Sequence, residues 1–415
     1  MHSAVYTYLE ENTLIPSCQS GFRPLHSTET TLHDFTNKCF QAMENGEVTG
    51  SVFIDLSKAF DCVDHEILVD KLKRLNMSPS VISWFESYLS GRSQSVKLDD
   101  KISKDLPLNV GVPQGSILGP LLFIIYTSDL PSCIPPNCNL FMYADDSTLT
   151  CSSSSINEVE RSLNVALDRI HNWCVRNKLR LNSNKTKCMI IGTRQKISDA
   201  ELNVYIADKL IIKEKCCKCL GVIIDDTLSW GPHVEYVRKA VSSKLGMLNR
   251  IRDCVTQNSL LTLFISLVMP TLEYCCTVWG GRYASHDNTL NKCLKRAARM
   301  ILKCTSLAPS AYMFARLNWI SFPERVKFKK ATLVFKCLNK MTPSYVANLF
   351  TPNAHIRETR QSTNKALKVP LAKKECYVKS FAVSGANIWN NLPEQLRRVD
   401  SLDTFKSELR QAISL

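Results

Sequence analysis

Apolar residues in the first half of the chain recur at two different spacings. Short apolar runs that end in polar residues are typical of buried strands, and apolar positions three and four residues apart are typical of amphipathic helices. These patterns predict strands at 52–54, 95–98, 105–110, 188–192 and 220–224, with a hairpin over 140–150. They predict helices at 67–75, 81–89, 117–126 and 156–173. The first half is therefore expected to be an α/β body.

From about Pro232 onward the spacing becomes mainly helical. The pattern predicts long helices at 234–252, 259–278, 287–304 and 323–340. Residues 342–383 are rich in Pro, Thr, Asn and Lys and are expected to be irregular, and two short helices near 385–391 and 402–413 close the chain. The second half is thus predicted to be a helical part joined to the α/β body.

Composition adds a charge asymmetry to this division. The chain has 415 residues, of which 45% are hydrophobic and 22% charged, as expected for a globular protein of two to three folding units. The net charge of +14 is uneven, because residues 1–230 carry a net charge of −4 and residues 231–415 one of +18. This asymmetry favours a metal-dependent body joined to a part that contacts a polyanion, with a merely solvated basic surface as the alternative.

The 18 cysteines are scattered along the chain. Cys216, Cys217 and Cys219 lie close together but lack a second group at zinc-binding spacing, so no zinc site is expected. The chain has neither a secretory signal at its start nor an apolar run of about 18 residues. We therefore expect reduced thiols, no membrane span, and an intracellular protein of the nucleus or cytoplasm.

Two adjacent acids stand between apolar strand segments in Tyr143-Ala144-Asp145-Asp146. Neighbouring carboxylates at a partly buried tip repel each other and need a compensating cation, for which a hard ion such as Mg²⁺ is suited. Asp55, at the end of its own apolar strand, is the obvious third carboxylate for a two-metal site. The alternative is an ordinary turn, which is the interpretation favoured for Asp99-Asp100 and Asp225-Asp226.

Several segments, in the expected order, resemble the reverse transcriptases of non-LTR retrotransposons, the jockey-like and LINE-type group. The resemblance covers residues 15–225 and, with less defined meaning, the tail around 384–393. The matching segments are Gly21-Phe22-Arg23 with Ser27-Thr28, Phe53 to Asp61, Gly111 to Ser116, Tyr143 to Asp146, Leu181-Asn182 with Lys185-Thr186, and Cys219 to Val222. Any one of these would be a weak signal, whereas their ordered set is specific.

The resemblance implies the catalytic chemistry. Asp55, Asp145 and Asp146 would hold two Mg²⁺ ions, with Mn²⁺ as a possible substitute, for phosphoryl transfer to a primer 3′-hydroxyl. The family's pattern places a proton donor for the leaving pyrophosphate at Lys185, and Lys187 competes for that role. Lys58 and Asp61, which flank the metal strand, are interpreted as local structural partners.

The same resemblance implies the substrate contacts. Phe60 would select deoxynucleotides by clashing with a 2′-hydroxyl, and a core phenylalanine is the alternative. Gln114 and Gly115 would contact the nascent base pair and the template, with a plain turn as the alternative. Leu220 and Gly221 would form a primer grip.

Arg23 would touch the template or a phosphate, and a surface salt bridge is the alternative. The strand that carries the primer grip departs from the family pattern by having Cys219 where an aromatic residue is usual. That departure matters little if the contact is made by the backbone.

The expected architecture is α/β (α+β): a right-hand polymerase palm with an antiparallel sheet, partial fingers, a helical thumb and a C-terminal extension. The corresponding segments are 1–45, 46–228, 229–341 and 342–415. The expected partners are an RNA template, a DNA primer and deoxynucleoside triphosphates. Only about twenty residues precede Gly21, so we expect an N-terminally truncated chain that lacks most of the fingers.

Two rivals to an active polymerase remain. One is a catalytically inactive relic that only binds nucleic acid. The other is a different metal-dependent phosphotransferase, such as a nuclease, built on the same carboxylates.

Overall fold

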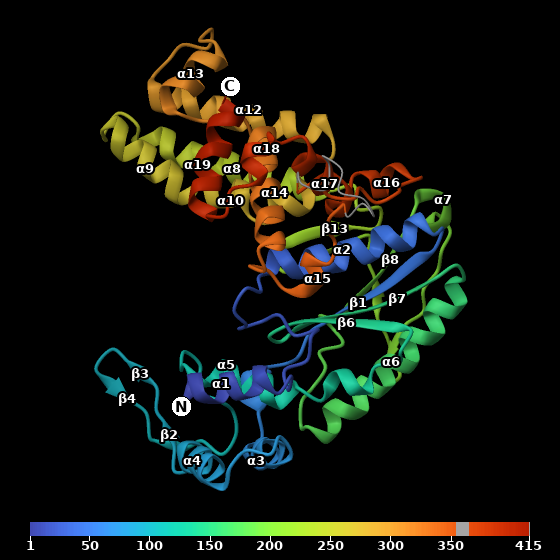
Figure 1. The fold of residues 1–415 in the computed structure, drawn as a ribbon. Helices are drawn as coiled ribbons and strands as arrows, with labels where there is room; N and C mark the ends of the chain where they lie inside the picture. The colour runs from blue at the N-terminus through green and yellow to red at the C-terminus, as the bar shows by residue number, and fades with distance from the viewer. Residues whose placement is uncertain (354–364, 415) are drawn as a thin grey trace. The chain divides into compact units, whose positions relative to one another are not determined.

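The computed structural model describes residues 1–353 and 365–414 (Figure 1). Contacts within the chain divide it into two compact units. Unit 1 comprises residues 1–26 and 47–217, and unit 2 comprises residues 27–46 and 218–415. Each unit is described by itself below.

Unit 1 is built on a five-stranded sheet with the strand order β11-β8-β1-β7-β6 (Figure 1). Its central strand β1 pairs antiparallel with β7 and β8, and β7 pairs antiparallel with β6. Only the short edge strand β11 runs parallel to its neighbour β8. The strands are β1 (Val48–Ile54), β6 (Cys138–Tyr143), β7 (Asp146–Ser153), β8 (Lys187–Ile191) and β11 (Ile212–Lys213).

One long helix covers a face of this sheet. In α6 (Ile156–Arg176) the buried side chains recur at helical spacing, so that a single apolar stripe faces the strands. Val159, Leu163 and Leu167 on this stripe are at most 1% exposed and belong to the main core of the unit. The packing of α6 fixes the plane of the sheet, and thereby the direction in which its strand ends point.

Shorter elements complete unit 1. They are α1 (His2–Glu11), the 3-10 helix η1 (Phe60–Cys62), α3 (His65–Arg74), α4 (Pro79–Leu89), α5 (Leu118–Thr127), η2 (Leu130–Cys133) and α7 (Arg194–Ile197). The paired short strands are β2 (Ser93–Gln94) with β5 (Leu106–Pro107), β3 (Lys97–Leu98) with β4 (Lys101–Ile102), and β9 (Tyr205–Ile206) with β10 (Lys209–Leu210). The buried helix α5 is apolar on all sides and lies in the core.

Unit 2 is mainly helical and includes a helix from the N-terminal part of the chain. Its helices are α2 (Thr28–Glu44), α8 (Gly231–Ile251), α9 (Gln257–Leu267), α10 (Met269–Glu273), α11 (Cys276–Trp279), α12 (Ala284–Leu302), α13 (Ser310–Leu317), α14 (Phe322–Leu338), α15 (Ser344–Ala347), α16 (Glu375–Val378), α17 (Phe381–Asn390), α18 (Glu394–Arg397) and α19 (Leu402–Ser414). Strand β13 (Val222–Asp225) pairs with β12 (Cys216–Cys219) at the junction of the two units' sequences.

Helix α14 is the centre of one core in unit 2. It packs against α12, α17 and α19, and Phe335 of α14 stacks on Phe405 of α19 with ring centroids 4.5 Å apart. Trp389 of α17 packs on the same Phe405 ring. The C-terminal residues are therefore an integral part of unit 2.

The mixed helix-and-sheet fold predicted from the sequence is confirmed, with two differences in detail. The predicted helix 259–278 is divided into α9, α10 and α11, because Pro270 lacks a backbone N–H and Cys275 has a left-handed φ of +48°. Helices α1, α2 and α13, and the four-residue helices α7, α15, α16 and α18, lie outside the predicted helices. Residues 354–364 of the region predicted to be irregular lie outside the described residues.

The two units also divide the chain differently from the four predicted segments. Residues 27–46 belong with the C-terminal half, and the described residues after 342 share a unit with α14. Among the described residues, each helix is too short or too polar to traverse a lipid bilayer.

Candidate functional site

Three aspartates come from two adjoining strands of the unit 1 sheet. Ile54 of β1 lies opposite Ser147 of β7, so the next position along each strand brings Asp55 beside Asp146. Strands β6 and β7 are joined by a tight turn in which Tyr143 pairs with Asp146. The antiparallel register therefore gathers the three acids that the sequence singles out at one edge of the sheet.

The negative charges of this cluster act on one another. Burial raises the pKa of the Asp146 carboxyl above its usual range, and the negative charges of Asp145 and Asp55 raise it further. In the described part of the chain, no lysine or arginine forms an ion pair with any of the three. Mutually repelling oxygen donors are the chemistry that a hard divalent cation satisfies.

The described residues nevertheless contain no group of three or more Asp, Glu, His or Cys side chains arranged to hold a metal ion as they stand. The charges of Asp55 and Asp145 are nevertheless close enough to Asp146 to raise the pKa of its carboxyl. The donor set thus fits a divalent cation in its chemistry.

Asp55 is held in place through its backbone. Its N–H donates to the Thr186 hydroxyl over 3.2 Å, and its carbonyl accepts from the Asn182 N–H over 2.9 Å. Thr186 is completely buried, so these contacts fix the strand end without using the carboxylate. The segment that the sequence analysis matched as a later palm motif therefore supports the first aspartate.

The two candidate lysines in the Thr186 segment differ in their surroundings. Lys187 forms an ion pair with Glu214 at 2.8 Å, which raises the pKa of Lys187. Lys185 is exposed, and no ion pair in the described residues involves it. This difference favours Lys185 over Lys187 as the mobile cation of the segment.

A buried glutamine that sequence reasoning missed clamps the turn before the paired acids. Gln19 is 1% exposed, and its side-chain oxygen accepts from the N–H groups of Ala144 at 3.0 Å and Gly21 at 2.8 Å. Ala144 has a left-handed φ of +57°, which is costly for a residue with a side chain and needs such support. A Cβ at Gly21 would come within 2.2 Å of the Ala144 nitrogen, so only glycine permits this approach.

Phe60 lies between a buried and an exposed aromatic ring. Its ring stacks on Phe123 of α5 at 4.4 Å and meets the edge of Phe22 at 6.3 Å. Phe60 is half-buried, whereas Phe22 is 50% exposed. The ring is thus packed on the core on one side and accessible on the other. This placement is compatible both with selection against a 2′-hydroxyl and with the role of a core phenylalanine.

The glycine loop is fastened to the segment that follows Asp55. The Val112 N–H donates to the Phe60 carbonyl over 2.9 Å, and the Gln114 side-chain amide donates to the Asp61 carboxylate over 2.8 Å. Gly115 is exposed and has open space around its α-carbon. The structure therefore brings Phe60, Gln114 and Gly115 together, and Asp61 acts as the structural partner of Gln114.

The predicted primer-grip residues form a tight turn between β12 and β13. Leu220 and Gly221 both have positive φ, +44° and +82°, as a two-residue hairpin turn requires. Tyr274 of unit 2 supports the turn, because its hydroxyl donates to the Leu220 carbonyl over 2.8 Å. The predicted strand over 220–224 thus begins two residues later than expected.

Arg23 is engaged within unit 1. Its guanidinium makes a two-pronged ion pair with Glu10, with both N···O distances 2.9 Å, and donates to the carbonyls of Pro16 and Gln19. Its side chain is only 11% exposed. These contacts favour the salt-bridge alternative for Arg23 over a template contact.

The other two aspartate pairs are turns. The buried Asp225 carboxylate accepts from the Thr227 hydroxyl and from the N–H groups of Ser229 and Trp230. Asp99 and Asp100 are exposed in the turn between β3 and β4. Asp225 thus differs from Asp145 and Asp146, to which the described residues donate no comparable set of hydrogen bonds.

Comparison with known proteins bears on the whole of this site. Residues 1–224 match the family described as reverse transcriptase (RNA-dependent DNA polymerase). The chain is 30% identical over 77% of its length to a Drosophila melanogaster protein named "Probable RNA-directed DNA polymerase from transposon BS", of which it covers 36%. It is 31% identical over 72% of its length to the RNA-directed DNA polymerase from mobile element jockey of Drosophila funebris, of which it covers 33%.

The chain spans about a third of the length of these curated relatives. Among solved structures, telomerase from Candida tropicalis aligns with 75% of this chain, and the alignment covers 51% of that chain, with a TM-score of 0.37 and 12% sequence identity. A likeness that distant adds nothing to the assignment. The family match over more than half of the chain contains every residue of the carboxylate cluster.

Proposed function

The chain belongs to the reverse transcriptase family, in its non-LTR retrotransposon group, and on that premise we propose that it carries out RNA-templated DNA synthesis. The observation that carries the proposal is the cluster of Asp55, Asp145 and Asp146 at one sheet edge without a neutralising side chain. Enzymes of this family use divalent metal ions, and here the ion is proposed to be Mg²⁺.

Asp55, Asp145 and Asp146 would hold the metal. Two bound Mg²⁺ ions would lower the pKa of the primer 3′-hydroxyl and neutralise the triphosphate and its leaving group. The chain's own contribution is to fix the carboxylates. Thr186 and Asn182 hold the backbone of Asp55.

Neighbouring residues would position and select the nucleotide. The accessible side of the Phe60 ring would exclude a 2′-hydroxyl, because its stacking on Phe123 prevents it from moving aside. Gln114 and Gly115, fastened beside Phe60 through Asp61 and Val112, would contact the nascent base pair and the template. Lys185 would donate a proton to the departing pyrophosphate.

The nucleic acid would be held largely through its phosphates. Unit 2 contains 31 Lys and Arg against 16 Asp and Glu, a net charge of +15, whereas unit 1 has a net charge of −1. A strongly basic unit binds the backbone of a template–primer duplex in a salt-sensitive and largely sequence-independent way. Leu220 and Gly221 would grip the primer through backbone groups exposed by their turn.

Primer extension on poly(rA) with an oligo(dT) primer, Mg²⁺ and dTTP tests the proposal. We expect extension by the wild type, none by the Asp145→Ala/Asp146→Ala variant, and full activity in Asp99→Ala/Asp100→Ala, which removes the same charge from an exposed turn of the same unit. A folded wild type that binds the duplex but does not extend it would contradict the proposal and support the binding-only relic. Cleavage of the nucleic acid without triphosphates would support the nuclease.

A further inference from the structure

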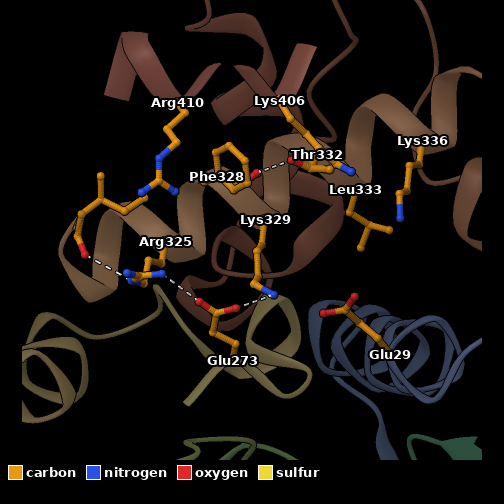
Figure 2. A pocket seen from close by; sticks show the side chains of 11 residues that line it. Glu29, Glu273, Arg325, Phe328, Lys329, Thr332, Leu333, Lys336, Lys406 and Arg410 are labelled. Carbon is orange, nitrogen blue, oxygen red and sulfur yellow. Dashed lines mark hydrogen bonds and ion pairs between the residues drawn. The ribbon is translucent and has the colours of Figure 1, made fainter. Parts of the chain in front are cut away.

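A basic pocket opens in unit 2, between helices that the polymerase chemistry does not use (Figure 2). Its volume is about 380 Å³, which lies within the range of small-ligand sites. Helix α14 forms one wall, α19 contributes two cations, and α2 and α10 contribute one glutamate each. The lining residues are Glu29, Glu273, Ile320, Arg325, Phe328, Lys329, Thr332, Leu333, Lys336, Lys406 and Arg410.

One end of the pocket is internally neutralised. The Glu273 carboxylate forms ion pairs with Arg325 at 3.0 Å and with Lys329 at 2.9 Å, which are drawn as dashed lines in Figure 2. Burial lowers the pKa of Arg325, whereas the hydrogen bond and charge of Glu273 outweigh burial and raise the pKa of Lys329. This end is a structural ion-pair network and leaves little capacity for a ligand.

Fewer carboxylates stand among the remaining cations: Glu29 lines the same pocket, and Asp403 lies 3.8 Å from Lys406. Lys336, Lys406 and Arg410 line the same pocket, and the five basic and two acidic side chains of the lining leave a formal charge of +3. Arg410 donates to the Asn318 carbonyl, and its charge contributes to the lowered pKa of Arg325. The excess of cations over carboxylates in the lining favours the binding of an anion.

The pocket also has an apolar surface beside its cations. Phe328 is only half-buried and lines the pocket together with Leu333. An aromatic ring flanked by Lys and Arg is the combination that binds single strands, where phosphates pair with the cations and an unstacked base packs on the ring. A duplex is too wide for a pocket of this size, whereas one nucleotide of a single strand is not.

We propose that this pocket binds one backbone phosphate, with its nucleotide, of single-stranded RNA. Lys336, Lys406 and Arg410 would contact the phosphate, and Phe328 would contact the sugar or base. The inference rests on the proposed function only in taking RNA as the polyanion that the chain meets. It adds an anchoring point for unpaired template that uses none of the carboxylate cluster.

Binding of a fluorescent single-stranded 20-nucleotide RNA, followed by anisotropy at several salt concentrations, tests the proposal. For Lys336→Ala/Lys406→Ala we expect about tenfold weaker binding and a slope of log affinity against log salt that is shallower by about 0.7 to 1.4, corresponding to one or two phosphate contacts. Lys292→Ala/Lys327→Ala removes the same charge from exposed positions of unit 2 outside the pocket and should change both quantities much less.

A second variant distinguishes RNA binding in the pocket from a general effect of lost positive charge. Phe328→Leu should weaken RNA binding several-fold while leaving the salt slope unchanged, because it removes ring contact and no charge. A blunt RNA–DNA duplex should bind all variants nearly alike. Thermal unfolding of each variant serves as the control for folding.

Equal RNA affinity in wild type and Lys336→Ala/Lys406→Ala, or an equal loss in the Lys292→Ala/Lys327→Ala control, would overturn the proposal. Micromolar binding of free pyrophosphate that Lys336→Ala/Lys406→Ala abolishes, with RNA affinity unchanged, would assign the pocket to a small anion instead. Primer extension at saturating primer–template should be the same in these variants as in the wild type. Failure of extension therefore tests the polymerase proposal, and the anisotropy measurement tests the pocket alone.

Discussion

Asp146 is the residue on which burial and charge act together in the carboxylate cluster. Its pKa is raised first by burial and then by Asp145 and Asp55, so its ionised form is the one that most needs a cation. Asp225 shows the opposite case, since three donors surround its buried carboxylate. The pairs Asp145-Asp146 and Asp225-Asp226 thus differ although their sequences are alike, because hydrogen-bond donors of the chain surround the carboxylate of Asp225.

Replacing Phe60 separates its two interpretations. Phe60→Val is expected to raise the incorporation of ribonucleotides relative to deoxynucleotides by about tenfold or more, because the ring would no longer block a 2′-hydroxyl. The measurement is the ratio of kcat/KM for UTP and dTTP on poly(rA). Phe123→Leu removes the ring that holds Phe60 in place, and is expected to raise the same ratio by a smaller factor while lowering stability. An unchanged ratio in Phe60→Val, with a lowered stability, would make Phe60 a core residue.

At the scale of elements, the turn between β6 and β7 is held from outside by residues 18–21. Cys18 and Ser20 exchange backbone hydrogen bonds with Met142. Gln19 satisfies the Ala144 N–H. The paired acids are therefore positioned by a segment more than a hundred residues away in sequence.

Gln19→Ala should weaken both stability and catalysis. It leaves the N–H groups of Ala144 and Gly21 without their acceptor, and each buried unpaired group costs about 1–3 kcal/mol. Denaturant unfolding and primer extension would measure the two losses. Gln94→Ala, at an exposed position of β2, is the matched control and should be neutral. Wild-type behaviour of Gln19→Ala would show that the turn holds its shape without the clamp.

The elements that sequence could predict are those with strong local patterns. The hairpin at 140–150, the strand before Asp55 and α6 all have clear apolar spacing, and the structure contains each of them. Helix α2 was missed because its buried positions include polar residues such as His33, Thr36 and Asn37. Gln19 was missed because a lone buried glutamine gives no periodic signal. The assignment of α2 to unit 2 depends on contacts distant in sequence, which local spacing does not encode.

The primer-grip turn shows a different limit. The run Leu220 to Ile224 reads as a continuous strand, yet its first two residues are a turn, because φ is positive at both. The Tyr274 hydroxyl stabilises this turn from a distant helix connection. We propose a primer contact for this turn from the resemblance to the family.

At the scale of the whole molecule, the structural units share the charge asymmetry of the sequence halves, with net charges of −1 and +15 for units 1 and 2. The whole of the chain's positive excess lies in unit 2, and the acidic cluster lies in unit 1. The second unit is thus suited to a polyanion and the first to cations.

Two buried histidines should make unit 2 sensitive to acid. Burial, together with the charge of a nearby lysine in each case, lowers the pKa of His33 to about 3 and that of His233 to about 4. Both stay neutral in the folded state, whereas an unfolded histidine takes up a proton below about pH 6.5. Their stabilising contribution is therefore complete above pH 6.5 and is lost as the pH falls through that value toward 4, by about 2 kcal/mol per histidine at pH 5 as an upper estimate.

Urea unfolding of the chain at pH 7.5 and pH 5.0 measures this loss. His33→Gln should reduce the difference between the two pH values, because glutamine takes up no proton on unfolding. His171→Gln, at a partly exposed position of α6, should leave the difference as it is in the wild type. A pH dependence unaffected by His33→Gln would place the acid sensitivity elsewhere.

The most direct test of the central claim is single-nucleotide incorporation on a mixed-sequence RNA template, with each of the four deoxynucleoside triphosphates offered alone. The account predicts that only the complementary nucleotide is added, that the rate falls at least a thousandfold in Asp146→Asn, and that Asp100→Asn behaves as the wild type. Incorporation that ignores the template, or that persists in a folded Asp146→Asn variant, would contradict it.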